Sequence, residues 1–152
     1  LANERLQVRH SDRACFSQNS LLGSEHIEMP LLGQFKSPEL YYGTFLHEMV
    51  HSTGSAKRLN RDLSGGFGSK DYAKEELSAE LGSAMLCASI GLAQKPRQDQ
   101  AQYIATWLRH LQNDKRFVIG AASQAQKAAD FIHESAEHYR QWLAGQTLMA
   151  AE

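Results

Sequence analysis

Two histidines and a glutamate at residues 47–51 have the types and spacing of a metal site. His47 and His51 are four residues apart, so in an α-helix their imidazoles lie on one face, one turn apart. Glu48 is placed to contact a water molecule on the same ion rather than the ion itself. This HExxH pattern is typical of zinc peptidases, in which the glutamate is the general base. Burying these groups among apolar residues is costly without a partner, which favours a metal site over hydrogen-bonded core histidines.

The residues around this motif predict the helix that positions it. Ser37 can cap its start, Pro38 suits the first helical position, and Glu39 is favourable at the positive N-terminal end. Most of the intervening residues are apolar, so we expect this helix to be largely buried. Gly54 is a plausible helix stop.

A catalytic zinc ion usually takes three protein ligands, so the third must come from outside the motif. We expect a second helix over residues 70–90, with apolar residues at helical spacing and Gly91 at its end. Its candidate ligands are Glu75, Glu76 and Glu80. Glu76 and Glu80 share a helix face, so one can bind the metal while the other holds a ligand histidine through its free ring nitrogen. The alternative is that all three are solvent-facing charges near a helix N-terminus.

This arrangement resembles the gluzincin, or thermolysin-like, metallopeptidases. The resemblance implies Glu76 as the third ligand and Glu80 as the acid that holds a histidine, although the position of Glu80 nearer the apolar stripe leaves an exchange of roles open. A peptidase of this kind also needs a donor that stabilises the developing oxyanion. Tyr72, Tyr103 and His110 are the candidates, and the residues alone do not choose among them.

Other segments predict an α+β domain around this site. Residues 14–18 and 26–29 are expected to form a small antiparallel sheet, whose second strand could line the cleft and pair with an extended peptide. Further helices are expected over residues 98–113 and 115–143, the latter with an alanine-rich face that permits close packing. Residues 145–152 are expected to form a frayed tail.

Residues 55–70 read as a loop with a glycine-rich stretch. The basic side chains of Lys57, Arg58 and Arg61 lie in this loop. The cluster is short and has no interleaved aromatic residues, so we expect solvated charges rather than a nucleic-acid site.

The composition indicates one globular domain over residues 1–152. The formal net charge of −1 gives no general attraction to DNA or acidic membranes. No apolar run approaches the roughly 20 residues needed to span a bilayer, and no signal peptide is recognisable. Cys15 and Cys87 are far apart and form no zinc-type pair. Because the chain starts at Leu1 rather than Met, we expect it to be a fragment of a longer protein.

The whole chain resembles the C-terminal zincin-like metallopeptidase domain of ArdC-type antirestriction proteins, which also occurs in TraC-type conjugation primases and phage polyvalent proteins. The resemblance begins with the run His-Glu-Met-Val-His-Ser-Thr-Gly and continues in order and spacing over most of the chain. The matching blocks are residues 27–30, 41–42, 47–54, 58–62, 67–68, 72–82, 103–108, 113–116 and 121–130.

The resemblance implies one Zn²⁺ per chain, held by His47, His51 and a glutamate of the 75–80 block, with Glu48 as the base. It implies a cytoplasmic protein of a mobile element that hydrolyses a peptide or protein, with a host restriction protein as a possible target. Single-stranded DNA would be bound by a preceding domain that is missing from this chain.

Two other functions compete with a zinc peptidase. In the first, zinc is structural and the domain binds DNA or a restriction–modification protein without catalysis. The intact Glu48 favours the enzyme, because a structural site needs no base. In the second, the domain is a metal-dependent nuclease, but such sites favour oxygen-rich coordination, often of two metals, over paired imidazoles.

Overall fold

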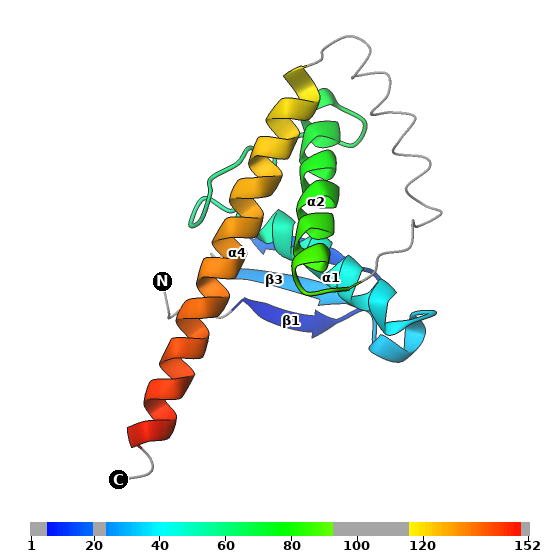
Figure 1. Cartoon of the computed structure of the whole chain (residues 1–152). Helices are drawn as coiled ribbons and strands as arrows, with labels where there is room; N and C mark the ends of the chain where they lie inside the picture. The colour runs from blue at the N-terminus through cyan, green and yellow to red at the C-terminus, as the bar shows by residue number, and fades with distance from the viewer. Residues whose placement is uncertain (1–5, 20–23, 93–115, 150–152) are drawn as a thin grey trace.

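The computed structural model describes residues 6–19, 24–92 and 116–149. A small sheet precedes three long helices (Figure 1), which confirms the expected α+β architecture. The helix expected over residues 98–113 lies outside the described residues. The elements are β1 (Gln7–His10), β2 (Cys15–Asn19), β3 (Ser24–Met29), a 3₁₀ turn (Leu32–Gln34), α1 (Pro38–Thr53), α2 (Lys70–Ser89) and α4 (Arg116–Met149).

The sheet differs from expectation in its strand directions. Its order is β1-β3-β2, with β2 antiparallel and β1 parallel to β3, so the sheet is mixed and not antiparallel. β3 is the central strand, and it carries two fully buried apolar side chains, Ile27 and Met29. The expectation that residues 26–29 offer an edge to a peptide is therefore wrong, since strands occupy both sides of β3.

α1 begins and ends where the sequence predicts. The Ser37 hydroxyl accepts a hydrogen bond from the Leu40 amide at 3.4 Å, Pro38 is the first helical residue, and Gly54 is the C-cap. α2 likewise ends before Gly91, whose φ of +71° is a left-handed conformation that glycine adopts without strain. Both helices that carry the candidate ligands thus have defined ends.

The three helices pack closely through small residues. Gly82 on α2 leaves no room for a side chain toward α1, because an added Cβ would lie 2.9 and 3.2 Å from the two methyl carbons of Val50. The same Cβ would be in ordinary contact with the Ala125 carbonyl oxygen on α4, at 3.5 Å. Buried alanines on α4 continue this seam, as the sequence predicts: Ala121, Ala125, Ala128 and Ala129. The close contact holds α1 and α2 in fixed register, which a site shared between them requires.

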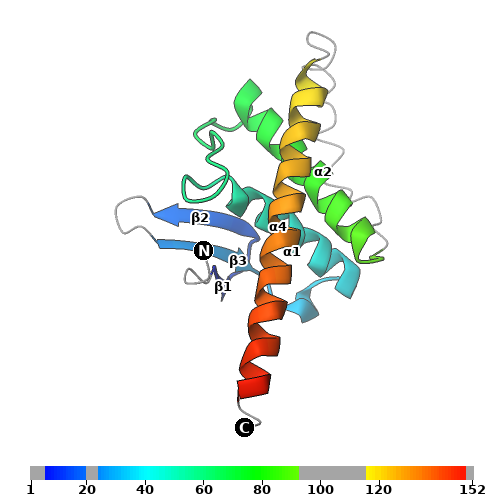
Figure 2. The same cartoon turned by 60° about the vertical axis from the view of Figure 1, so that its left-hand side comes forward.

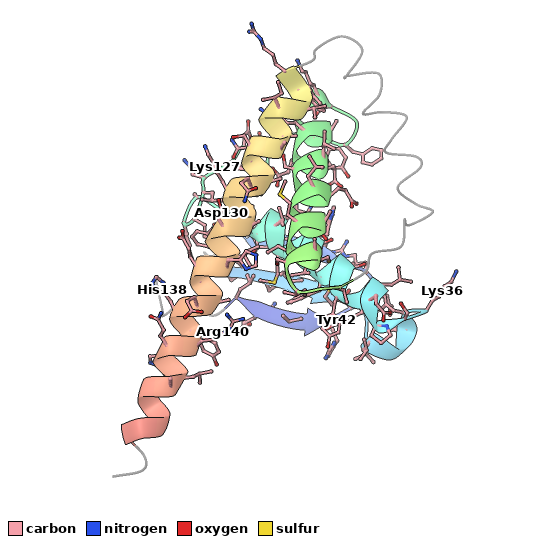
Figure 3. All side chains as sticks on the ribbon, viewed as in Figure 1. Lys36, Tyr42, Lys127, Asp130, His138 and Arg140 are labelled. Atoms are coloured by element: carbon pink, nitrogen blue, oxygen red, sulfur yellow. The ribbon has the colours of Figure 1, made fainter. Side chains whose placement is uncertain are left out.

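α4 extends beyond the other two helices and the sheet. Figures 1 and 2 show it beside α2 and then extending past the sheet toward the C-terminus. Its exposed end carries His138 and Arg140 (Figure 3). The helix runs to Met149, so residues 145–149, which we expected to fray, are helical. Among the described residues, no helix combines the length and the apolar composition needed to cross a bilayer.

The loop after α1 is fastened to the sheet by Arg58. Its guanidinium donates to Glu25 Oε2 at 2.7 Å and to the Ser52 carbonyl at 2.9 Å, and Ser55 donates to the other oxygen of Glu25. The side chains of Arg58 and Glu25 are only 13% and 12% exposed. The expectation of a solvated charge is therefore wrong for Arg58, which joins β3 to the end of α1.

The contact of Glu25 with Ser55 and Arg58, called the clasp below, should make the free energy of unfolding depend on pH. Burial alone would raise the pKa of Glu25, but hydrogen bonds from Ser55 and Arg58 and the charge of Arg58 lower it below its ordinary value. A carboxyl with a lowered folded-state pKa stabilises the fold above its unfolded pKa of about 4.3, and this contribution is lost as the pH falls through the folded value. We expect Glu25→Gln to cost roughly 1–3 kcal/mol at pH 7.

Urea denaturation between pH 7 and 3 measures this effect. The free energy of unfolding should fall more steeply for wild type than for Glu25→Gln over the acidic part of that range. Glu134→Gln, which changes an exposed glutamate on α4, should follow the wild-type curve. Parallel curves for wild type and Glu25→Gln would contradict the role of the clasp.

Candidate metal centre

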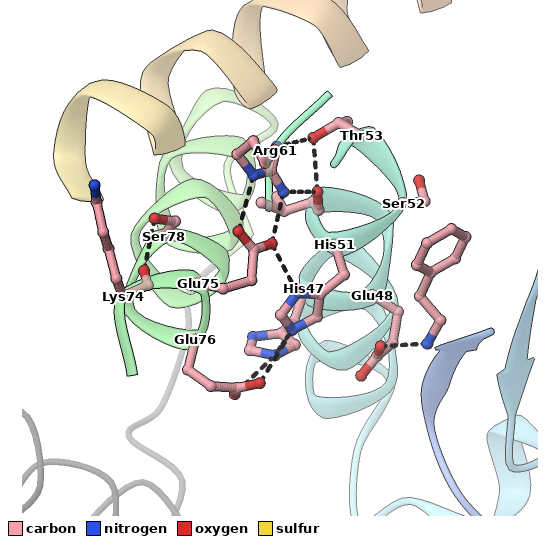
Figure 4. A network of polar contacts seen from close by, with 12 residues as sticks. His47, Glu48, His51, Ser52, Thr53, Arg61, Lys74, Glu75, Glu76 and Ser78 are labelled. Atoms are coloured by element: carbon pink, nitrogen blue, oxygen red, sulfur yellow. Dashed lines mark hydrogen bonds and ion pairs between the residues drawn. The ribbon is translucent and has the colours of Figure 1, made fainter. Parts of the chain in front are cut away.

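Three donor groups from α1 and α2 converge at one point. The Nε2 atoms of His47 and His51 are 3.0 Å apart. The carboxylate of Glu76 reaches both rings, with one oxygen 3.7 Å from His47 Nε2 and the other 3.5 Å from His51 Nε2. The three donor atoms all lie within 4.8 Å of one another. Figure 4 shows Glu76 on α2 turned toward the two histidines on α1.

The second ring nitrogen of each histidine faces another carboxylate of α2. Glu75 Oε1 lies 3.1 Å from His51 Nδ1, and Glu80 Oε1 lies 3.4 Å from His47 Nδ1. Such outer carboxylates fix the orientation and the tautomer of a metal-binding imidazole and increase its basicity. The structure thus places Glu80 beside the outer ring nitrogen of His47. It places Glu75, which the sequence offered only as a third candidate ligand, beside the outer ring nitrogen of His51.

Arg61 holds Glu75 in place. Its guanidinium donates to both oxygens of Glu75, at 2.9 and 2.7 Å, and also to Thr53 Oγ1 at 2.7 Å and the Val50 carbonyl at 2.8 Å. The Arg61 side chain is only 5% exposed, so the expectation of a solvated loop charge is wrong here as well. No local pattern marks this residue, because its partners lie on two helices.

Gly54 allows the loop to return to the site. An added Cβ at this position would lie 2.8 Å from a Leu63 methyl group and 3.1 Å from an Arg61 nitrogen. The glycine at the end of α1 therefore does more than stop the helix. It leaves the space through which the loop brings Arg61 against the two helices.

The charges in this cluster shift two pKa values in opposite directions. Burial alone would lower the pKa of His51, but hydrogen bonds to Glu75 and Glu76 and the negative charges of Glu76 and Glu48 raise it to about 10. Burial alone would raise the pKa of Glu75, but hydrogen bonds from Arg61 and His51 lower it below its ordinary value. Without a metal ion, these carboxylates favour the positively charged imidazolium form of His51, and a bound metal cation would replace that positive charge.

Comparison with known proteins places this chain in a family. A zincin-like metallopeptidase model matches residues 1–124. The chain belongs to this family. Its relatives include the protein y4eC of Sinorhizobium fredii (strain NBRC 101917 / NGR234), 43% identical over 128 residues, which are 84% of this chain and 41% of that protein. They also include the DNA primase TraC of Escherichia coli, 41% identical over 134 residues, which are 87% of this chain and 12% of TraC.

Solved structures of a zincin-like relative agree with the fold. The antirestriction protein ArdC from plasmid R388 in its Mn(II)-bound form is 42% identical, with a TM-score of 0.73 over 86% of this chain and 48% of ArdC. Its metal-free form is 41% identical, with a TM-score of 0.72 over 88% of this chain and 47% of ArdC. The chain therefore spans less than half the length of the relatives it matches.

The donor set of this zincin-like domain fits a divalent transition metal. Two imidazoles and a carboxylate are the kinds of ligand that zinc takes at about 2.0–2.2 Å, and three protein ligands is the usual number in catalytic zinc sites. Among the described residues, His47, His51 and Glu76 are the one group of three such donors that comes this close.

The site opens into a cleft of about 490 Å³. Glu48 lies in the wall of this cleft, 8% exposed, and its Oε2 accepts a hydrogen bond from the Phe16 amide at 2.8 Å. Tyr72 also lines the cleft, one helical turn before Glu76. Of the three residues considered as oxyanion donors, Tyr72 is thus placed at the site, whereas Tyr103 and His110 lie outside the described residues.

Proposed function

We propose that this domain is a zinc-dependent peptidase. The observation that carries the proposal is the convergence of His47, His51 and Glu76 in a cleft that Glu48 also lines. That ArdC, 42% identical to this chain, has a Mn(II)-bound form supports divalent-metal binding in this family. We assign zinc as the ion and one ion per chain, with Glu80 and Glu75 holding the ligand histidines.

Each residue then has a defined task. Bound zinc would lower the pKa of a water molecule toward about 7 and polarise the carbonyl of the scissile bond. Glu48 accepts the proton of the attacking water and later donates it to the leaving nitrogen. Tyr72 is the candidate donor to the developing oxyanion. The surrounding helices keep these groups in place before the substrate arrives.

The charge of the cleft favours a peptide over a nucleic acid. Its described lining contains no Lys or Arg. It contains six carboxylates: Glu48, Asp62, Asp71, Glu75, Glu76 and Glu80. A phosphate backbone is bound through Lys and Arg, so a nucleic acid would be repelled from these walls. β2 is the strand whose residues line the cleft and whose outer edge lies away from β3. An extended peptide can therefore pair with β2 instead of β3.

The relatives suggest where this activity is used. ArdC is an antirestriction protein of a plasmid, and TraC is a DNA primase. We propose that the present domain acts in the cytoplasm as part of a mobile-element protein that protects incoming DNA. Its substrate would then be a protein of the host restriction system, and any single-stranded DNA would be bound outside this domain.

Glu48→Gln tests the peptidase directly. With zinc-loaded protein and fluorescently labelled casein as the probe, we expect wild type to release labelled fragments. Glu48→Gln should slow this about 10²- to 10⁴-fold, because the general base is lost, while elemental analysis still finds zinc. Glu39→Gln, an exposed position at the start of the same helix, is the matched control and should hydrolyse casein like wild type.

Two results would oppose this assignment. Hydrolysis by Glu48→Gln at the wild-type rate would mean that another group is the base. Zinc-loaded wild type that cleaves neither casein nor a library of extended peptides would favour a non-catalytic zinc module that binds DNA or a restriction–modification protein.

A further inference from the structure

The backbone amide of Phe16 points away from its own sheet. In an antiparallel ladder, residues alternate between pairs that exchange hydrogen bonds across the strands and pairs that do not. Phe16 lies opposite Ile27 in the register of β2 and β3, yet its N–H donates to Glu48 Oε2 at 2.8 Å. The hydrogen-bonded pairs are therefore the neighbouring ones, which involve Cys15 and Ser17. The Phe16 amide lies on the outer edge of β2, facing α1.

This contact joins a rigid donor to a buried charge. Glu48 is 8% exposed, and a buried carboxylate is costly unless it accepts hydrogen bonds. A bond from an amide to a carboxylate is charge-assisted and stronger than one between neutral groups. The position of the amide is set by its strand rather than by a side-chain rotamer. Glu48 therefore cannot rotate about its own side-chain bonds without losing this donor.

We propose that the Phe16 amide is a positioning group that fixes the Glu48 carboxylate in the cleft. The inference rests on the proposed function, in which Glu48 is the base. With one oxygen held by β2, the orientation of the carboxylate toward the metal centre is set by the sheet as well as by α1. A substrate that pairs with β2 then does so in a register that leaves this N–H to Glu48. Only the backbone of Phe16 is required, so the ring can be replaced.

Hydrogen exchange tests the contact without any catalytic assay. In the metal-free protein, followed by NMR, the Phe16 amide should exchange slowly although it lies on a strand edge. Glu48→Ala should speed its exchange at least about tenfold, whereas Glu48→Gln should preserve the protection, because the amide oxygen of glutamine still accepts a hydrogen bond. The Ser17 amide, which faces β3, is the internal control and should be unaffected. Equal Phe16 exchange in wild type and Glu48→Ala would overturn the proposal.

Proline at position 16 tests the consequence for hydrolysis. Phe16→Pro removes the N–H, and an outward-facing position on an edge strand tolerates proline. In the zinc-loaded protein with labelled casein, kcat should fall at least about tenfold, while KM and zinc content stay unchanged. Phe16→Leu keeps the N–H and should keep the wild-type kcat, with any effect of the smaller side chain on substrate binding confined to KM. Gln18→Pro removes the next outward-facing N–H of β2, which a paired peptide would use, so it should raise KM and leave kcat unchanged.

The two experiments distinguish a failure of the positioning role of Phe16 from a failure of the proposed peptidase activity. A Phe16→Pro variant that is folded by circular dichroism and retains the wild-type kcat would overturn the positioning role. If Phe16→Pro does not fold, the exchange rates in the Glu48 variants still decide whether β2 holds the carboxylate. If wild type hydrolyses nothing, the proposed function fails, but hydrogen exchange still tests the contact between the Phe16 amide and Glu48 independently.

Discussion

Replacing Glu76 with Gln should weaken zinc binding far more than replacing Glu80 with Gln. Glu76 is the carboxylate whose oxygens reach Nε2 of both histidines, at 3.7 and 3.5 Å, whereas Glu80 lies beside the opposite ring nitrogen of His47. Loss of an outer carboxylate typically costs about 10- to 100-fold in metal affinity. We expect that range for Glu80→Gln and a loss of more than about 100-fold for Glu76→Gln, because a direct ligand is removed.

Competition against a chelating zinc indicator measures both affinities. Asp71→Asn is the matched control, since Asp71 lines the same cleft on the same helix but is not one of the three converging donors. It should change the affinity less than about threefold. A larger loss for Glu80→Gln than for Glu76→Gln would mean that the two carboxylates exchange roles when metal binds.

Arg61→Met should destabilise the metal-free fold by about 3–5 kcal/mol. The guanidinium donates to both oxygens of Glu75, and the two side chains are 5% and 12% exposed. Removing Arg61 leaves the buried Glu75 carboxylate with His51 as its remaining partner, and this loss of charge compensation is the origin of the large cost. The variant also frees the Thr53 hydroxyl and the Val50 carbonyl at the end of α1 from their Arg61 contact.

Urea denaturation of the metal-free proteins measures the difference in the free energy of unfolding between wild type and Arg61→Met. Lys57→Met changes an exposed basic residue of the same loop and should stay within about 0.5 kcal/mol of wild type. The double variant Arg61→Met with Glu75→Gln should recover part of the loss, because the uncompensated carboxylate is gone. A loss below about 1 kcal/mol for Arg61→Met alone would contradict the role assigned to this pair.

The parts of the fold that follow from local sequence were predictable. α1 has a capping serine, a proline at its first position and a glycine at its end, and each acts within a few residues of itself. The spacing of His47 and His51 needs only helical geometry. The alanine-rich face of α4 is also a local pattern, and its close contact with α2 confirms that prediction.

The parts that depend on distant segments were not predictable in the same way. The parallel pairing of β1 with β3 joins segments 19 positions apart, and short strands do not show their pairing partner or direction in their own pattern. The loop basic residues Arg58 and Arg61 look solvated in sequence, because their acidic partners are 33 and 14 positions away. The contact between Phe16 and Glu48 likewise joins positions 32 apart.

The helix carrying three nearby glutamates shows where sequence reasoning reached its limit. Helical spacing puts Glu76 and Glu80 on one face, but it does not say which of them meets Nε2 of the histidines. That depends on how far α2 is displaced along α1, which the close contact of Gly82 with Val50 determines. The same displacement brings Glu75 against His51, a contact that spacing alone does not indicate.

The most direct test is a crystal structure of the zinc-soaked protein, with anomalous diffraction recorded at the zinc edge. We predict one peak per chain, about 2.0–2.2 Å from Nε2 of His47, Nε2 of His51 and an oxygen of Glu76, with no fourth protein ligand. A peak elsewhere, or a fourth side chain that closes the coordination sphere, would contradict the hydrolytic centre proposed for this domain.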